Sequence, residues 1–141
     1  MTLNCRGLAS LPKKIAVKRL IDEQSLDVIF LQETMFDGSV LVKEMESLLR
    51  DWQFISVDAK GRSGGLLLGW RTRKFLLLSA WSMNSGLCAV MYSFEMQLEL
   101  CFLNLYGPYT DREAFWNNLS VMDCFNFPNL VVGGDLNFSL G

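Results

Sequence analysis

Five short apolar segments follow one another in the middle of the chain, with only a few residues between one segment and the next. They are 52–57, 64–70, 75–81, 87–94 and 98–107. Each has the length of one β-strand, and connections this short join antiparallel strands, whereas a parallel crossover needs about a dozen residues or more. We therefore predict a block of β-hairpins between residues 52 and 107.

Segments with helical spacing precede and follow this block. Pro12 is expected to open the first helix, with Lys14 turned away from the core. The apolar face of this helix is formed by Ala16, Val17, Leu20 and Ile21. A second helix is expected over 39–50, and a third begins at the T-x-x-E capping box of Thr110 and Glu113.

Three further apolar runs, at 3–5, 26–33 and 130–134, are expected to form strands. Helices thus come early and late in the chain, with the hairpin block between them. This order favours an α/β (α+β) domain built in layers over a regular βαβ repeat.

The composition sets limits on size and on charge. The 141 residues are enough for one domain with a hydrophobic core, and no repeat or change of composition marks a second domain. The formal net charge is −2 and the pI is about 5.1. The chain therefore lacks the overall basic charge of a strong non-specific DNA binder, although an enzyme with local contacts to DNA is still allowed.

The four cysteines, Cys5, Cys88, Cys101 and Cys124, are far apart in the sequence, and no C-x-x-C pair occurs. We interpret them as free thiols without a disulfide partner, which is typical of an intracellular protein, nuclear or cytoplasmic, rather than a secreted one. The longest apolar runs, such as 75–81, are too short to cross a bilayer, so no membrane association is expected.

Polar side chains stand at the ends of four of the expected strands. They are Asn4, Glu33, Asn104 with Tyr106, and Asp135 with Asn137. Ligands of open sheets bind outside the carboxyl ends of the strands, so these side chains converge on one pocket if the strands are neighbours. Carboxylates and amides suit Mg²⁺, and the remaining polar groups can bond phosphate oxygens while the metal stabilises charge on the phosphoryl group.

Each of these residues also has a simpler interpretation. An Asp-x-Asn sequence after a strand is most often a turn whose side chains bond the local backbone. Glu33 by itself suits a solvated charge or a helix cap, and Tyr106 beside Gly-Pro suits a packed turn. The order and spacing of all the residues together favour the site.

Five motifs occur along the whole chain in a specific combination. They are NCRG at 4–7, DVIFLQET at 27–34, GRSGGLLLGW at 61–70, LNLYGP at 103–108 and VVGGDLN at 131–137. Together they resemble the endonuclease/exonuclease/phosphatase superfamily, which includes pancreatic deoxyribonuclease and the abasic-site endonucleases. The GRSGG motif followed by an aromatic residue is most similar to the endonuclease domain of plant LINE-type (non-LTR) retrotransposons.

The resemblance implies a four-layered α/β sandwich, with two mixed β-sheets face to face and helices outside them. It also implies Mg²⁺-dependent phosphodiester cleavage of DNA, with Mn²⁺ as a possible substitute. By position, Glu33 would be the main metal ligand and Asn4 would steady the metal site. Asp135 would orient or deprotonate the attacking water.

The remaining roles concern the substrate. Tyr106 and Asn104 would contact the phosphate, and Asn137 would hold it. Arg62 and Ser63 lie in a loop that could approach the DNA backbone, although a solvated turn is the simpler interpretation.

The chain departs from the family pattern in several places. Leu3 stands where the family usually has tryptophan, and Leu136 replaces the commoner phenylalanine. The family domain ends in a Ser-Asp-His segment that completes the site, and this chain contains no histidine. We therefore expect residues 1–141 to be a partial domain, incomplete at the C-terminus, weakly active or inactive, and prone to self-association through exposed sheet edges.

Three functions are consistent with these features. The first is a DNA-nicking endonuclease fragment of retrotransposon origin. The second is a non-catalytic remnant or partner-binding module. The third keeps the same superfamily but acts on a phosphomonoester or a phospholipid head group, which the GRSGG loop disfavours.

Overall fold

The structure is a computed structural model that describes residues 1–58, 64–83, 86–107, 113 and 126–135. Its elements in chain order are β1 (Thr2–Asn4), α1 (Leu11–Glu23), β2 (Val28–Gln32), α2 (Gly38–Leu48), β3 (Trp52–Val57), β4 (Leu66–Arg71), β5 (Phe75–Met83), β6 (Gly86–Ser93), β7 (Leu98–Tyr106) and β8 (Leu130–Asp135). Every strand expected from the sequence is present. Of the third helix, predicted from Thr110, the structure describes Glu113 alone, which is helical, and the rest falls outside the described residues.

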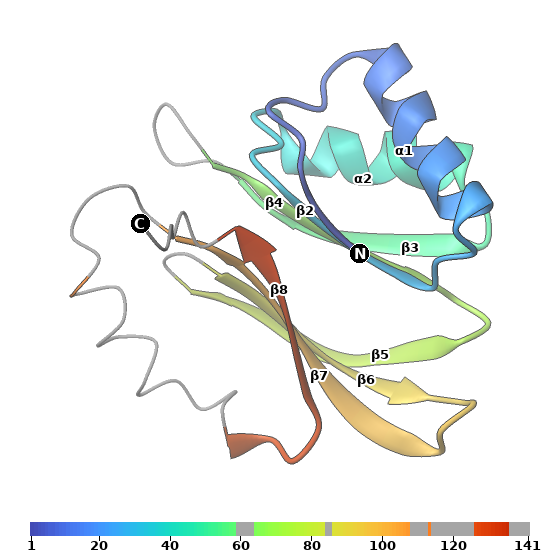
Figure 1. Cartoon of the computed structure of the whole chain (residues 1–141), viewed down its shortest axis with the longest axis vertical. Coiled ribbons are helices and arrows are strands. Elements are labelled where there is room, and N and C mark those ends of the chain that lie inside the picture. The colour runs from blue at the N-terminus through green and yellow to red at the C-terminus, as the bar shows by residue number, and fades with distance from the viewer. Residues whose placement is uncertain (59–63, 84–85, 108–112, 114–125, 136–141) are drawn as a thin grey trace.

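The strands form two four-stranded sheets that lie face to face, with α1 and α2 on the outer side of the first sheet (Figure 1). The strand orders are β1-β2-β4-β3 and β5-β6-β7-β8. Each sheet contains one parallel pair, β1 with β2 and β7 with β8, among antiparallel pairs. The predicted sandwich of two mixed sheets with flanking helices is confirmed.

The hairpin block is divided between the two sheets. β3 pairs with β4 in the first sheet, whereas β5, β6 and β7 form an antiparallel meander in the second. The turn between β4 and β5 therefore carries the chain from one sheet to the other. Side chains alternate between the two faces of a strand, and β2, β4, β6 and β7 each bury one set of side chains in the layer between the sheets. This shared layer explains why the block divides into two sheets that face each other.

The core has three parts. One part lies between the helices and the first sheet, where Ile21, Met45 and Leu31 are buried. The second fills the space between the sheets and includes Phe30 and Phe102. A third cluster lies on the other face of the second sheet. Among the described residues, no helix is long and apolar enough to cross a membrane.

Helix α1 differs from the expected face. Val17 and Ile21 are buried as predicted, but Ala16 is exposed. Lys14, expected to point away, is only 5% exposed. Its ammonium group pairs with Glu44 of α2 and donates to the carbonyl of Ala9, so burial is compensated by these two partners.

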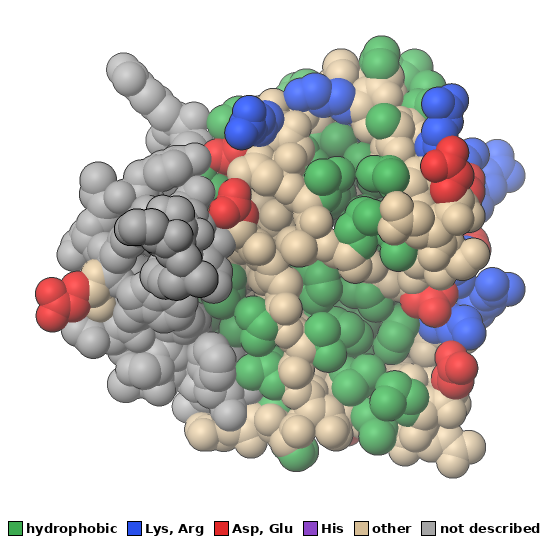
Figure 2. Space-filling model, in the orientation of Figure 1, with side chains coloured by type: hydrophobic (Ala, Val, Ile, Leu, Met, Phe, Trp, Pro, Cys, Tyr) green, Lys and Arg blue, Asp and Glu red, His purple; other side chains and the backbone are tan. Residues whose placement is uncertain are grey.

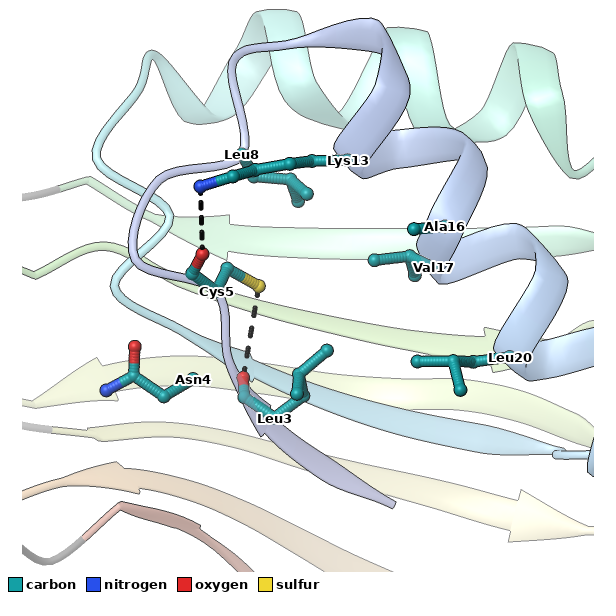
Figure 3. A pocket seen from close by; sticks show the side chains of 8 residues that line it. All are labelled: Leu3, Asn4, Cys5, Leu8, Lys13, Ala16, Val17 and Leu20. Carbon is teal, nitrogen blue, oxygen red and sulfur yellow. Dashed lines mark hydrogen bonds between the residues drawn. The ribbon is translucent and has the colours of Figure 1, made fainter.

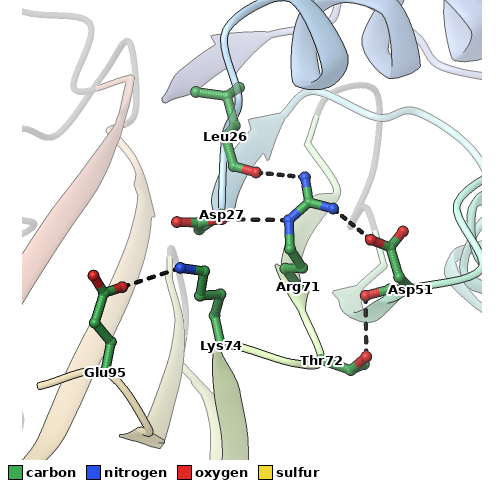
Figure 4. A network of polar contacts seen from close by, with 7 residues as sticks. All are labelled: Leu26, Asp27, Asp51, Arg71, Thr72, Lys74 and Glu95. Carbon is green, nitrogen blue, oxygen red and sulfur yellow. Dashed lines mark hydrogen bonds and ion pairs between the residues drawn. The ribbon is translucent and has the colours of Figure 1, made fainter.

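An arginine joins three strands of the first sheet at the end opposite Glu33 (Figure 4). Arg71, in β4, donates from Nε to Asp27 Oδ1 at 3.3 Å and from Nη2 to the carbonyl of Leu26 at 3.0 Å. Its Nη1 pairs with Asp51, and its guanidinium stacks on Trp52. All of these contacts are structural, because they connect the ends of β2, β3 and β4.

Candidate active site

Four of the side chains singled out from the sequence lie together at the ends of β1, β2, β7 and β8. Tyr106 donates its hydroxyl to Glu33 Oε1 at 2.7 Å, and Asn4 donates from Nδ2 to Asp135 Oδ2 at 2.8 Å. Tyr106 and Asp135 are register partners in the β7–β8 pair. Each hydrogen bond connects the two sheets, so the site is formed only when the sandwich is assembled.

The backbone turns sharply at Glu33, directly after β2. Its φ of 53° lies in the left-handed region, which is costly for a residue with a side chain. Its carbonyl accepts from the N–H of Gly7 at 2.7 Å, so the loop after β1 holds this turn. Strained backbone of this kind concentrates at functional sites, and here it directs a carboxylate into the space between the sheets.

The carboxylate of Glu33 is buried, with only 7% of the residue exposed. In the described part of the chain, no lysine or arginine forms an ion pair with this carboxylate, and the Tyr106 hydroxyl donates a hydrogen bond to it. A buried carboxylate without a cation is costly, and a bound metal ion is one way to compensate it.

The donors present fit a hard divalent cation. The described residues contain no group of three His, Cys, Asp or Glu side chains that could hold a metal by themselves. Mg²⁺ does not need such a group, because it binds through one or two carboxylates and keeps several waters. Glu33 and the Asn4–Asp135 pair supply oxygen atoms of this kind.

Two residues not singled out from the sequence fix the orientation of Asn4. Its Oδ1 accepts from the backbone N–H of Arg6 at 3.1 Å, which turns its NH₂ group toward Asp135. Lys13 donates from Nζ to the carbonyls of Cys5 and Arg6, at 3.3 and 3.0 Å, and so holds the same loop. Because Oδ1 of Asn4 already accepts this hydrogen bond, its second lone pair is the one that remains for the predicted metal contact.

Two glycines let the strand that carries Asp135 approach its neighbours. A Cβ at Gly133 would lie 2.7 Å from the ring of Phe30 in the opposite sheet. Gly134 has a φ of 138°, and a Cβ there would lie 2.0 Å from the carbonyl oxygen of Leu105. The paired glycines of the VVGGD segment are therefore explained by close packing directly before Asp135.

Other predicted site residues lie elsewhere. Asn104 is completely buried between the sheets, where its amide bonds Gln32 and two backbone carbonyls. This position differs from the predicted phosphate contact, because all three hydrogen-bonding groups of its side chain are used inside the protein. Asn137, Arg62 and Ser63 lie outside the described residues. Gln32, which donates to Asn104, was not predicted to take part in this region, although it stands directly before Glu33 in the LQET motif.

A cavity of about 230 Å³ adjoins the site between β1 and α1 (Figure 3). Its lining is mostly apolar and consists of Leu3, Asn4, Cys5, Leu8, Lys13, Ala16, Val17 and Leu20. Burial raises the pKa of the Cys5 thiol from 9.0 to about 11, with Lys13 opposing the shift and Glu33 adding to it. Cys5 is therefore a neutral thiol at physiological pH.

Alkylation of Cys5 by iodoacetamide is expected to remain slow in the folded chain until the pH approaches about 11. The reason is that the thiolate is the nucleophile, and a raised pKa keeps its concentration low. Mass spectrometry of the Cys5 peptide across a pH series measures this rate. The urea-unfolded chain is the control and should react with the ordinary pH dependence. A half-maximal rate near pH 9.0 in the folded chain would contradict the burial of this thiol.

Comparison with solved structures shows the same fold in distant proteins. D. rerio TDP2 complexed with a single-strand DNA product aligns at a TM-score of 0.72 with 15% identity, over 98% of this chain and 60% of that one. A mannosyl-6-phosphatase of Bacteroides thetaiotaomicron gives 0.69 and 16%, over 96% and 64%. The human Nocturnin catalytic domain with bound sulfate gives 0.63 and 16%, over 92% and 58%.

The chain therefore spans about three fifths of the length of these proteins. A comparison with curated proteins finds no match. The model of the Endonuclease/Exonuclease/phosphatase family matches residues 1–141, which is the entire chain. With the two mixed sheets and the polar strand ends that the structure shows, the chain belongs to the endonuclease/exonuclease/phosphatase family.

Proposed function

We propose that the chain carries the metal-binding and water-activating part of a phosphodiesterase that nicks DNA. The observation that carries the proposal is the pair of hydrogen bonds Tyr106–Glu33 and Asn4–Asp135, which lie side by side where four strands from two sheets end. The family includes nucleases and phosphatases, and its members generally depend on divalent metal ions.

Glu33 would hold the metal, assisted by the remaining lone pair of Asn4 Oδ1. When bound, Mg²⁺ or Mn²⁺ would neutralise charge on the phosphoryl group under attack. Tyr106 would contact the phosphate once a metal occupies the Glu33 carboxylate, because its single hydroxyl proton, donated to Glu33 Oε1 in the metal-free chain, would then turn to a phosphate oxygen. Asn137 is proposed to hold the same phosphate.

Asp135 would orient the attacking water and accept its proton. The Asn4 N–H that donates to Asp135 Oδ2 fixes the plane of this carboxylate, and a fixed acceptor lowers the cost of aligning the water. The chain contains no histidine, so no imidazole is available as a base, and Asp135 is the base proposed here. Without an imidazole to assist proton transfer, the expected rate of phosphodiester cleavage is lower than that of a site that has one.

DNA is the proposed substrate. Two observations support it: the GRSGG motif, which is similar to that of LINE-type retrotransposon endonucleases, and the single-strand DNA product in the D. rerio TDP2 structure. Cleavage would expose a 3′-hydroxyl on the nicked strand. A phosphomonoester is the second candidate, because the Bacteroides relative of similar fold is a mannosyl-6-phosphatase.

Incubation of the chain with supercoiled plasmid tests the proposal. Conversion to the open-circular form is expected with Mg²⁺ and not with EDTA. Bis(p-nitrophenyl) phosphate and p-nitrophenyl phosphate, assayed in parallel, separate a phosphodiesterase from a phosphomonoesterase. Cleavage of the monoester alone would favour the second candidate, and no cleavage of any substrate would favour a non-catalytic module.

We also propose that the chain associates with itself through β8, the edge strand of the second sheet among the described residues. Val131 and Val132 of this strand are 38% and 47% exposed, and the face that carries β1 and β8 shows grouped hydrophobic side chains (Figure 2). Such an edge pairs readily with another strand, and lysine on an edge opposes pairing.

Sedimentation velocity is expected to show association that grows with protein concentration and decreases in Val131→Lys. Val40→Lys is the matched control, because Val40 is also 38% exposed but lies on α2. Equal association of both variants would place the contact elsewhere.

A further inference from the structure

Directly behind the Glu33–Tyr106 pair, two buried amides connect the sheets. Gln32 is the last residue of β2 and Asn104 lies within β7, and they are 1% and 0% exposed. Gln32 Nε2 donates to Asn104 Oδ1 at 2.9 Å. The layer around them is filled by apolar side chains, where a polar group is costly unless its hydrogen bonds are made.

Every hydrogen bond of the Asn104 side chain reaches the opposite sheet. Besides accepting from Gln32, its Nδ2 donates to the carbonyl oxygens of Leu31 and Leu67, both at 3.1 Å. Those carbonyls belong to β2 and β4, which are paired. Both N–H groups are thus used, and their acceptors are backbone atoms that no rotamer change can move. Asn104 fixes β7 against β2 and β4 at one point.

Gln32 extends this connection to the strand that carries Asn4. Its Nε2 also donates to Thr2 Oγ1 of β1 at 2.9 Å. Asn4 is the register partner of Gln32 in the β1–β2 pair. One connected set of hydrogen bonds therefore holds three of the four strands on which the candidate site is built.

The position of this set in the sequence relates it to the site. Gln32 is followed directly by Glu33, and Asn104 precedes Tyr106 by two residues, which places both side chains on the same face of β7. The separation of the sheets at Gln32 and Asn104 thus determines the separation at Glu33 and Tyr106. A hydrogen bond of 2.7 Å tolerates little change in that separation.

We infer that Gln32 and Asn104 are positioning residues for the site: their hydrogen bonds hold the sheets at the separation at which Tyr106 reaches Glu33, and so orient the Glu33 carboxylate. The inference rests on the proposed function for the role of Glu33 toward a metal. A buried amide pair with only a structural role would contribute to stability without controlling this orientation.

The double variant Gln32→Leu/Asn104→Leu separates the two roles. Replacing both partners by apolar side chains leaves neither amide unpaired, and the carbonyls of Leu31 and Leu67 that lose a donor lie within the β2–β4 pair, so the thermal unfolding midpoint should fall less than in Asn104→Leu alone. The ¹³Cζ resonance of Tyr106 is measured in the metal-free chain and assigned with Tyr106→Phe. It is expected to move toward the chemical shift of a tyrosine whose hydroxyl makes no hydrogen bond to a carboxylate. The affinity for Mn²⁺ is expected to fall about 10- to 100-fold, as when a group behind a metal ligand is lost.

Leu103→Ala is the matched control. Leu103 is the neighbour of Asn104 in β7 and is equally buried, but it packs in the cluster on the other face of the sheet. This variant should lose stability and keep both the Tyr106 resonance and the Mn²⁺ affinity. Should the double variant not fold, Gln32→Met is expected to show the same two changes to a smaller extent.

Wild-type values of the Tyr106 resonance and of Mn²⁺ affinity in a folded Gln32→Leu/Asn104→Leu chain would overturn the inference. Failure of the proposed function has a different signature. If the wild-type chain binds no Mn²⁺ at all, the metal assignment is wrong, while the metal-free resonance still decides whether these amides position the Glu33–Tyr106 pair.

Discussion

Asp135→Asn is expected to lower the rate of plasmid nicking by about 10²- to 10⁴-fold, the usual contribution of a positioned general base. The substitution keeps the size of the side chain but removes the group proposed to accept the proton of the attacking water. Because the chain contains no histidine, no imidazole is available to take over this task. The initial rate of open-circle formation at saturating Mg²⁺ measures the effect.

A second aspartate provides the control for this substitution. Asp22 lies exposed on α1, so Asp22→Asn makes the same change in charge outside the site and should leave the rate unchanged. Asp135→Asn should also fold like the wild-type chain, since Asn4 can still form a hydrogen bond to the new amide. A nicking rate within twofold of wild type would show that Asp135 is not the base.

The strands could be predicted from the sequence because each is a short apolar run between polar breaks. Their division into two sheets could not, because the turn after Arg71 resembles the other short connections of the block. The sheet that a strand joins after such a turn depends on which buried layer its apolar side chains can fill. That information lies in the partner strands, and β6 and β7 supply it through Met91 and Phe102.

The candidate site was predictable to a similar extent. The grouping of Glu33, Tyr106 and Asp135 could be predicted, because polar residues that end apolar strands come together where neighbouring strands end. The supporting contacts could not, since Lys13 and Arg6 act through backbone groups of a loop whose path the sequence does not show. Asn104 shows the opposite error. Its spacing from Tyr106 suggested a phosphate contact, but its side chain is completely buried between the sheets.

Glu33→Gln tests the metal site, and two effects of opposite sign are expected. The amide keeps the size of the side chain and an oxygen that can accept from Tyr106, but it removes the charge. Metal affinity should therefore fall by more than about 100-fold, beyond the loss caused by groups that only support a ligand. The metal-free chain should become more stable, because a buried carboxylate without a cation is replaced by a neutral group.

The expected gain in unfolding free energy without metal is on the order of 1 kcal/mol, which lies within the usual range of single stabilising substitutions. At 100 times the wild-type dissociation constant, Mg²⁺ should stabilise the wild-type chain by about 2.7 kcal/mol and so raise its unfolding midpoint, and it should stabilise Glu33→Gln by less than about 0.4 kcal/mol. Calorimetric titration and thermal unfolding with and without Mg²⁺ measure both effects. Glu23→Gln is the control, because Glu23 is exposed at the end of α1. A Glu33→Gln chain that is less stable without metal and still stabilised by Mg²⁺ would mean that this carboxylate serves the fold through Tyr106 and that the metal, if bound, lies elsewhere.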